Sequence, residues 1–145
     1  DWLNPHALPM LEEMVVDGAW WDYVDALATR HFGELLRNHP APMKRLLRRW
    51  ARDRNIWRRR VAILAQLKFK AETDEQLLLD VIVPSRQEGE FFLRKSIGWA
   101  LREYSKTSPD FVIDYVHQYA DELSGLSKRE ALKVLIKQGV ISEVP

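Results

Sequence analysis

The chain has 145 residues, of which 46% are hydrophobic and 30% are charged, and its formal net charge is +1. This length and composition allow one compact hydrophobic core, which excludes a disordered chain. The absence of cysteine excludes disulfides, thiolate metal sites and cysteine nucleophiles, and no apolar run approaches the roughly 18 residues that span a membrane.

The four histidines, at positions 6, 31, 39 and 117, are scattered without the spacing of metal ligands. We therefore expect no metal site. No basic-then-apolar leader is present, so we expect a cytoplasmic protein. The chain starts with Asp-Trp-Leu rather than Met, and we expect a fragment or a processed product.

Strand signals are nearly absent, and proline, glycine and helix-capping residues divide the chain into about eight predicted helices. The predicted helices cover residues 6–17, 20–37, 41–52, 55–70, 74–87, 90–106, 109–122 and 128–138. Chain reversals are expected at His39 to Pro42 and at Gly125. Three sequence signals predict helix starts, namely possible capping boxes at Thr73-x-x-Gln76 and Ser127-x-x-Glu130, and Ser108 before Pro109.

The predicted helix 20–37 contains a carboxylate in an unusual place. The helical neighbours of Asp25 at three, four and seven residues are Trp21, Ala28, Thr29 and Phe32, which form a mostly apolar strip. A charged side chain on such a strip needs a compensating group nearby.

A strongly basic run follows between residues 43 and 70, where eleven Lys or Arg accompany a single acid, Asp53. The remainder of the chain has eleven bases and twenty acids. This clustering predicts DNA or RNA as a partner, although a solvated helix face would also account for it. The predicted DNA-binding residues are Lys44, Arg45, Arg48, Arg49, Arg52, Arg54, Arg58, Arg59, Lys68 and Lys70, joined by Lys95 and Arg102 from a later helix.

Within the predicted helix 55–70, Arg60 shares its stripe with Ile56, Trp57, Ile63, Leu64 and Leu67. A guanidinium centred on an apolar stripe must be paired or must face a groove. A structural salt bridge is the simpler explanation, and an anionic ligand is the functional one.

In the predicted helix 90–106, Trp99 falls opposite the apolar face formed by Leu93, Ile97, Leu101 and Tyr104. We expect its indole to be exposed between Lys95 and Arg102, where it could contact sugars or bases.

The second helices of successive pairs recur at about 36 residues, with Trp21, Trp57 and Leu93 in step. This period predicts an all-α fold, an α-solenoid of antiparallel helix pairs resembling HEAT repeats, curved and with a basic concave face. Equivalent helices in a solenoid stand side by side, so Asp25, Arg60 and Trp99 are predicted to converge on one patch with Trp21. A fixed carboxylate there could stabilise the oxocarbenium-like sugar formed when an N-glycosidic bond breaks, and could position the attacking water.

The stretches WWDYVD, NIWRRRVAILAQLKFK, SIGWALREYSKTSPDFV and LSGLSKREALK resemble the DNA alkylation repair proteins of the AlkD type. These are alkylpurine DNA glycosylases built from HEAT-like repeats, and the resemblance runs from about residue 10 to 138. It implies catalytic roles for Trp21, Asp25, Arg60 and Trp99, with Trp20 as the alternative to Trp21.

The resemblance also implies excision of cationic N3- and N7-alkylated purines from double-stranded DNA, without metal or organic cofactor and without rotation of the lesion into a pocket. Members of this family are longer, with further N-terminal helices. We therefore expect residues 1–145 to be one HEAT-like domain, the C-terminal part of a longer one, in a monomeric, nucleoid-associated protein. The alternatives are a non-catalytic binder of duplex or branched DNA and a protein-binding solenoid.

Overall fold

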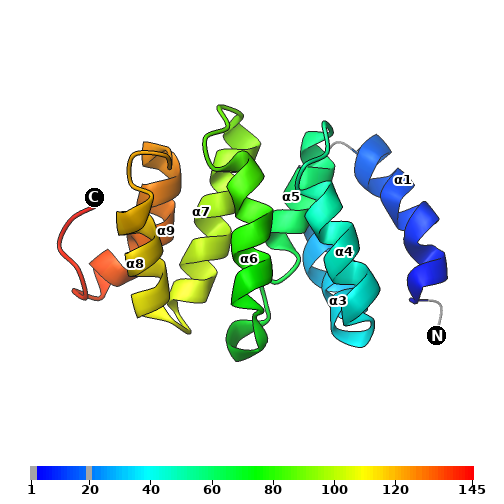
Figure 1. Ribbon diagram of the computed structural model, residues 1–145, viewed down its shortest axis with the longest axis horizontal. Helices are drawn as coiled ribbons and strands as arrows, with labels where there is room; N and C mark the ends of the chain where they lie inside the picture. The colour runs from blue at the N-terminus through cyan, green and yellow to red at the C-terminus, as the bar shows by residue number, and fades with distance from the viewer. Residues whose placement is uncertain (1–2, 19–20) are drawn as a thin grey trace.

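The structure is a computed structural model that describes residues 3–18 and 21–145. Every regular element in these two segments is a helix, and the helices follow one another as antiparallel pairs arranged in a row (Figure 1). The α-helices are α1 (Leu8–Gly18), α2 (Trp21–Ala26), α3 (Gly33–Asn38), α4 (Pro40–Trp50), α5 (Ile56–Leu64), α6 (Glu75–Ile82), α7 (Phe91–Ser105), α8 (Pro109–Gln118) and α9 (Gly125–Lys137).

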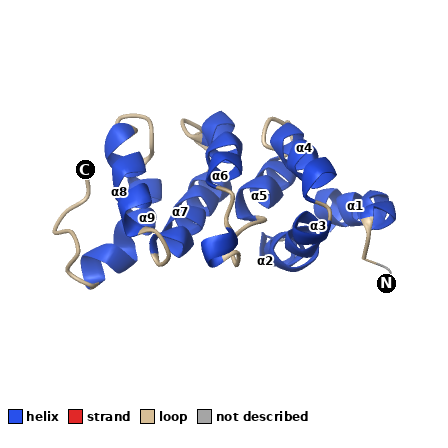
Figure 2. Ribbon diagram, turned by 60° about the horizontal axis from the view of Figure 1, so that its bottom comes forward, coloured by secondary structure: helices blue, strands red, loops and turns tan. Residues whose placement is uncertain are grey.

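The pairs form two layers, which are visible in both ribbon views (Figures 1 and 2). The front layer contains α4, α6 and α8, and the back layer contains α2, α3, α5, α7 and α9. Helices α2, α5, α7 and α9 start at residues 21, 56, 91 and 125, so each begins 34 or 35 residues after the previous one. The predicted α-solenoid and its repeat period are confirmed, and α2, α5 and α7 belong to the same layer.

The predicted helix 20–37 is interrupted by a wider turn. A π-helix, η2 (Leu27–Phe32), separates α2 from α3, and it begins two residues after Asp25. Gly33 follows η2, and a Cβ built there would lie 3.0 Å from the backbone oxygen of Ala65. A glycine therefore lets the start of α3 approach the end of α5. Single π-turns often occur at functional sites in helices.

Two predicted helix caps were wrong, by one residue at α6 and by three residues at α9. Helix α6 is capped by Asp74, whose side chain accepts from the Leu77 N–H, and not by Thr73. Helix α9 is capped by Ser124, whose hydroxyl accepts from the Ser127 N–H, so Gly125 is its first residue and not a reversal. Ser108 lies at the N-cap of α8 as predicted, but its side chain makes no capping hydrogen bond.

Several predicted helices also end earlier than expected. Helix α5 ends at Leu64 and continues as turns to the 3-10 helix η3 (Lys70–Glu72), while α6 ends at Ile82 and passes into η4 (Val83–Ser85). Pro84 lies within η4, where a missing N–H and a fixed φ do not favour a continued α-helix. A further 3-10 helix, η1 (Pro5–Ala7), precedes α1.

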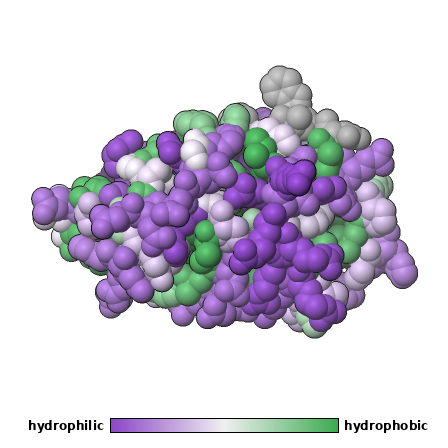
Figure 3. Space-filling view, turned by 45° about the horizontal axis from the view of Figure 1, so that its top comes forward, coloured by the Kyte–Doolittle hydropathy of each residue, from purple (hydrophilic) through white to green (hydrophobic). Residues whose placement is uncertain are grey.

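One hydrophobic core runs along the row between the two layers. It contains Leu11 from α1, Leu47 from α4, Ile63 from α5, Ile97 from α7 and Leu132 from α9. Arg60 is among the largest fully buried side chains, with 1% of its surface exposed. Hydrophilic residues dominate the face in Figure 3, with apolar residues in small patches. Within the described segments, no helix is both long and apolar enough to cross a membrane.

Candidate functional site

Asp25 lies near the end of α2, in the back layer and one residue after the buried Val24. Its backbone oxygen accepts a hydrogen bond from the Thr29 hydroxyl at 3.0 Å, at the start of the π-helix. The side chain of Asp25 retains 17% exposure, so the carboxylate is sheltered but still reaches the surface.

Arg60 forms a two-point ion pair with Asp25. Its Nε donates to Oδ1 at 2.6 Å, and its Nη2 donates to Oδ2 at 2.8 Å. Fork-to-fork pairing of this kind fixes both the distance and the plane of the carboxylate. Arg60 is therefore the compensating group expected for Asp25, and Asp25 is the anion expected for Arg60.

The third contact of the guanidinium holds it against α7. Arg60 Nη1 donates to the backbone oxygen of Phe92, and its carbon Cζ lies 5.9 Å from the centre of the Phe92 ring. Helix α5 itself is started by Asn55, whose side chain accepts from the backbone N–H groups of Trp57 and Arg58. Arg60 thus joins α2, α5 and α7, and its buried position leaves little freedom to move.

Trp99 completes the described part of the patch. The centre of its ring lies 5.0 Å from Arg60 Cζ and 5.8 Å from the Lys95 ammonium, within the range of cation–π contact. The indole is half-buried and packs against the core, so the expectation that it would be exposed was wrong. The helical-wheel argument considered α7 alone and could not include the cover supplied by α5.

Asp25, Arg60 and Trp99 are thus brought together as the repeat spacing predicted, with Arg60 in contact with both of the others. Trp21 starts α2, but its side chain lies outside the described part of the structure, and Trp20 lies outside it entirely. The choice between these two tryptophans therefore stays a prediction.

Six of the twelve predicted DNA-binding side chains are engaged in ion pairs with acids of the same chain. The pairs are Lys44 with Asp74, Arg48 with Asp80, Arg58 with Asp53 and Glu12, Arg59 with Glu88, and both Lys95 and Arg102 with Glu130. Half of the basic set therefore connects neighbouring helices.

The other six are exposed and form no ion pair with any described residue, namely Arg45, Arg49, Arg52, Arg54, Lys68 and Lys70. Arg45 and Arg49 lie on α4 opposite its buried residues Met43, Leu47 and Trp50, and Arg52 follows in the turn just past the end of α4. We call these three residues the α4 arginine stripe. It faces away from the core on the front layer, whereas Asp25 lies in the back layer.

A solved structure described as a predicted DNA alkylation repair enzyme from Enterococcus faecalis is similar to this chain. The TM-score is 0.81 and the sequence identity is 36% over 91% of this chain, which corresponds to 60% of the other. The profile of the DNA alkylation repair enzyme family matches residues 1–135. No curated protein matches the chain.

The chain belongs to the DNA alkylation repair enzyme family. The chain spans 60% of the length of the similar solved structure.

Sequence reasoning missed two parts of the patch. The backbone oxygen that Phe92 offers to Arg60 has no side-chain signal. Glu130 accepts from Lys95 at 2.8 Å and from Arg102 at 3.1 Å, on either side of Trp99 along α7. Gly98 could have indicated the close approach of Glu130, because a glycine within a helix often marks close packing. A Cβ built at Gly98 would lie 2.5 Å from the Cβ of Glu130.

Proposed function

We propose that this protein is a DNA glycosylase that hydrolyses the N-glycosidic bond of cationic N3- and N7-alkylated purines in duplex DNA. The observation that supports the proposal most is the Asp25–Arg60 pair, in which a partly exposed carboxylate is fixed at two points by a buried guanidinium beside Trp99. An acid on a DNA-binding surface is repelled by phosphates, so a fixed acid there needs a role that outweighs the repulsion.

The proposed reaction breaks the bond between C1′ of the deoxyribose and the purine nitrogen. The bonding electrons pass to the purine and neutralise its positive charge, so the base leaves without a general acid. The sugar becomes oxocarbenium-like, and the Asp25 carboxylate stabilises the developing charge. A water positioned by Asp25 then forms the new C1′–O bond and loses its proton to the carboxylate or to solvent.

Arg60 and Trp99 are assigned supporting roles. Arg60 holds the carboxylate in place, since a rigidly positioned charge stabilises a transition state without reorganising. The half-buried indole of Trp99 offers an aromatic surface next to the pair, which favours polarised C–H groups of a cationic sugar. By analogy with the family, Trp21 is proposed to frame the carboxylate from α2.

The test is release of 7-methylguanine from methylated duplex DNA by the wild type, Asp25→Asn and Asp22→Asn. Asp22 is a matched control because it is an exposed acid on the same helix, bonded only to its neighbour's N–H at 3.0 Å in the described structure. We expect Asp25→Asn to lower release at least about 100-fold, as for loss of one electrostatic stabiliser, and Asp22→Asn to stay near the wild type. Equal release by Asp25→Asn and the wild type would remove Asp25 from the mechanism.

The alternative is a non-catalytic binder of duplex or branched DNA. The exposed basic side chains that favour this alternative are also needed by a glycosylase. Only a measurement of base release therefore distinguishes the two functions. Binding is measured in parallel on an unmethylated duplex and on a four-way junction. A wild type that binds these DNAs and releases no base would make the binder the better description.

A further inference from the structure

Three lysines line a hollow between the segment that follows α5 and the end of α7. The hollow is lined by Leu67, Lys68, Lys70, Glu103, Lys106 and Thr107. We call it the lysine pocket. Its volume of about 620 Å³ is many times the roughly 30 Å³ that one water occupies in the liquid, so a phosphate group fits inside it.

The lysine pocket lies at the C-terminal ends of α5 and α7, the helices that carry Arg60 and Trp99. Glu103 and Lys106 follow Trp99 by four and seven residues, and Leu67 follows Arg60 by seven. Glu103 shares the α7 stripe of Trp99, whereas Lys106 lies one residue past the end of α7 and Leu67 lies three residues past the end of α5. At a rise of 1.5 Å per residue, Glu103 lies about 6 Å beyond Trp99 along α7.

The charge of the pocket is not balanced by its own residues. Among the three lysines, Lys106 is the one that pairs with a described acid, Glu103, at 2.6 Å. Lys68 and Lys70 are exposed and form no ion pair with any residue that the structure describes. Three ammonium groups therefore accompany one carboxylate, and an anion is the ligand that this excess favours.

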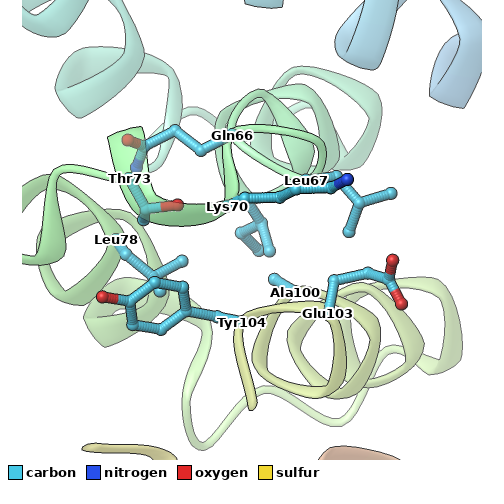
Figure 4. Close-up of a pocket in the computed structure, with 9 residues that line it drawn as sticks. Gln66, Leu67, Lys70, Thr73, Leu78, Ala100, Glu103 and Tyr104 are labelled. Atoms are coloured by element: carbon cyan, nitrogen blue, oxygen red, sulfur yellow. The ribbon is translucent and has the colours of Figure 1, made fainter. Parts of the chain in front are cut away.

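Lys70 adds a second observation. Its φ of 52° lies in the left-handed region, which glycine tolerates and most other residues avoid. Helix C-termini attract cations and account for Lys68 and Lys106 without any ligand, but not for a lysine at a position that suits glycine. Figure 4 shows a neighbouring pocket that shares Leu67, Lys70 and Glu103 with the lysine pocket. In it, the Lys70 side chain extends past Leu67 toward the side of the pocket where Glu103 lies.

We propose that the lysine pocket binds a backbone phosphate of the DNA strand, within about three nucleotides of the sugar that faces Asp25. The register rests on the proposed function. Lys68 and Lys70 donate to the phosphate oxygens, while Lys106 stays paired with Glu103. The pocket thereby sets the position of the strand relative to the carboxylate and reads no base.

The first measurement is the salt dependence of binding to an undamaged duplex by the wild type and by Lys68→Gln/Lys70→Gln. Losing one phosphate contact should reduce the slope of log K against log salt by about 0.9. Both side chains are exposed, and the thermal midpoint establishes that the variant folds. An unchanged slope in a folded variant would overturn the proposal.

The second measurement locates the phosphate. Duplexes carry one tetrahydrofuran abasic site, to fix the register, and one neutral methylphosphonate at a series of positions. We expect a neutral linkage at one position within about three nucleotides of the abasic site to weaken wild-type binding about fivefold and to leave binding by Lys68→Gln/Lys70→Gln unchanged. The control variant Lys133→Gln/Lys137→Gln removes two exposed lysines of α9. Its binding should be weakened by the neutral linkage at that position as much as wild-type binding is.

If every position weakens the variant as much as the wild type, the lysines act only through their overall charge, and the pocket is not a phosphate site. Failure of the proposed function is seen separately. Full base release by Asp25→Asn would refute the mechanism, while the salt slope, which needs no lesion and no catalysis, would still decide the phosphate contact.

Discussion

The Asp25–Arg60 pair places two charges at the junction of three helices, with one partner almost completely buried. A buried pair of this kind gives little net stability against an apolar replacement, yet losing one partner leaves an uncompensated charge. The pair is therefore better explained by its geometry than by its contribution to stability, because the two-point contact fixes the carboxylate.

A double-mutant cycle with Asp25→Asn and Arg60→Gln tests this coupling. We expect Arg60→Gln to lower the free energy of unfolding by about 3 kcal/mol, because Asp25 loses its partner. The double variant should be less destabilised than the sum of the singles by about 1–3 kcal/mol, measured by urea denaturation. Additive losses would mean that the pair is not a coupled unit in solution.

Lys70→Gly should separate stability from DNA binding. Glycine adopts a φ of 52° without steric cost, so the free energy of unfolding should rise by up to about 1 kcal/mol despite the greater entropy of the unfolded chain. Duplex binding should weaken at the same time, because an ammonium group is lost. Thermal denaturation measures the change in stability, and a titration on the same protein sample measures the change in duplex binding. Lys68→Gly is the control and is expected to lose stability, because the backbone at Lys68 does not have a positive φ.

At the residue scale, the sequence identified Asp25 and Arg60 as misplaced charges because each interrupts an apolar helical stripe. It could not identify their partners, since pairing across 35 residues requires the register of neighbouring helices. Trp99 was misjudged for the same reason. The contact with Phe92 goes to a backbone oxygen, which no residue type at that position would reveal.

The contact between α7 and α9 depends on close approach at the element scale. At Gly98 an added Cβ would meet the Glu130 Cβ at 2.5 Å and the backbone oxygen of Ser127 at 3.3 Å. Gly98→Ala should therefore move the two helices apart and lower the free energy of unfolding by about 2 kcal/mol. Gly89→Ala is the matched control, because its Cβ would meet nothing closer than an Arg94 nitrogen at 3.8 Å. Equal stability of the two variants would show that α9 shifts without cost.

Glu130 makes the same contact dependent on pH. Its hydrogen bond from Lys95 lowers its pKa below the ordinary value of 4.5, against the opposing effect of burial, and the charges of Lys95, Lys133 and Arg102 lower it further. A carboxyl with a lowered folded-state pKa stabilises the fold above its ordinary pKa, and this contribution is lost as pH falls through the folded value.

Wild-type stability should therefore fall more steeply below about pH 4.5 than that of Glu130→Gln. Asp74, whose pKa is lowered by its hydrogen bond from Lys44, remains in both proteins, so the difference isolates Glu130. Urea midpoints between pH 7 and pH 3 measure it. Parallel curves for the two proteins would contradict the assigned role of Glu130.

Helix existence and repeat period were accessible from the sequence, because hydrophobic spacing and caps recur in every pair. Helix starts were less predictable from the sequence, because two residues could serve as the N-cap in each case. The candidates were Thr73 or Asp74 for α6 and Ser127 or Ser124 for α9. Ser127 instead donates its hydroxyl to the backbone oxygen of Arg94, which joins α9 to α7. The π-helix at 27–32 had no signal, because its side chains fit an ordinary helical pattern equally well.

At the scale of the whole molecule, the basic run from residue 43 to 70 is divided between two layers and two uses. Lys44 pairs with Asp74 at the N-cap of α6 and Arg48 pairs with Asp80 within α6, so these two side chains connect α4 to the next repeat. The α4 arginine stripe has no such partner among the described residues and points away from the core. A single basic face, as inferred from composition, is thus too simple.

A duplex lying on the back layer, where Asp25 reaches the surface, cannot also touch the outward face of α4. Replacing Arg45, Arg49 and Arg52 together by Gln should therefore change the slope of log K against log salt by less than one phosphate contact, about 0.9. The thermal midpoint should stay near the wild type, because these exposed side chains form no ion pair with a described residue. A fall of two or more in the slope would place DNA on the front layer and separate the main binding surface from the Asp25–Arg60 pair.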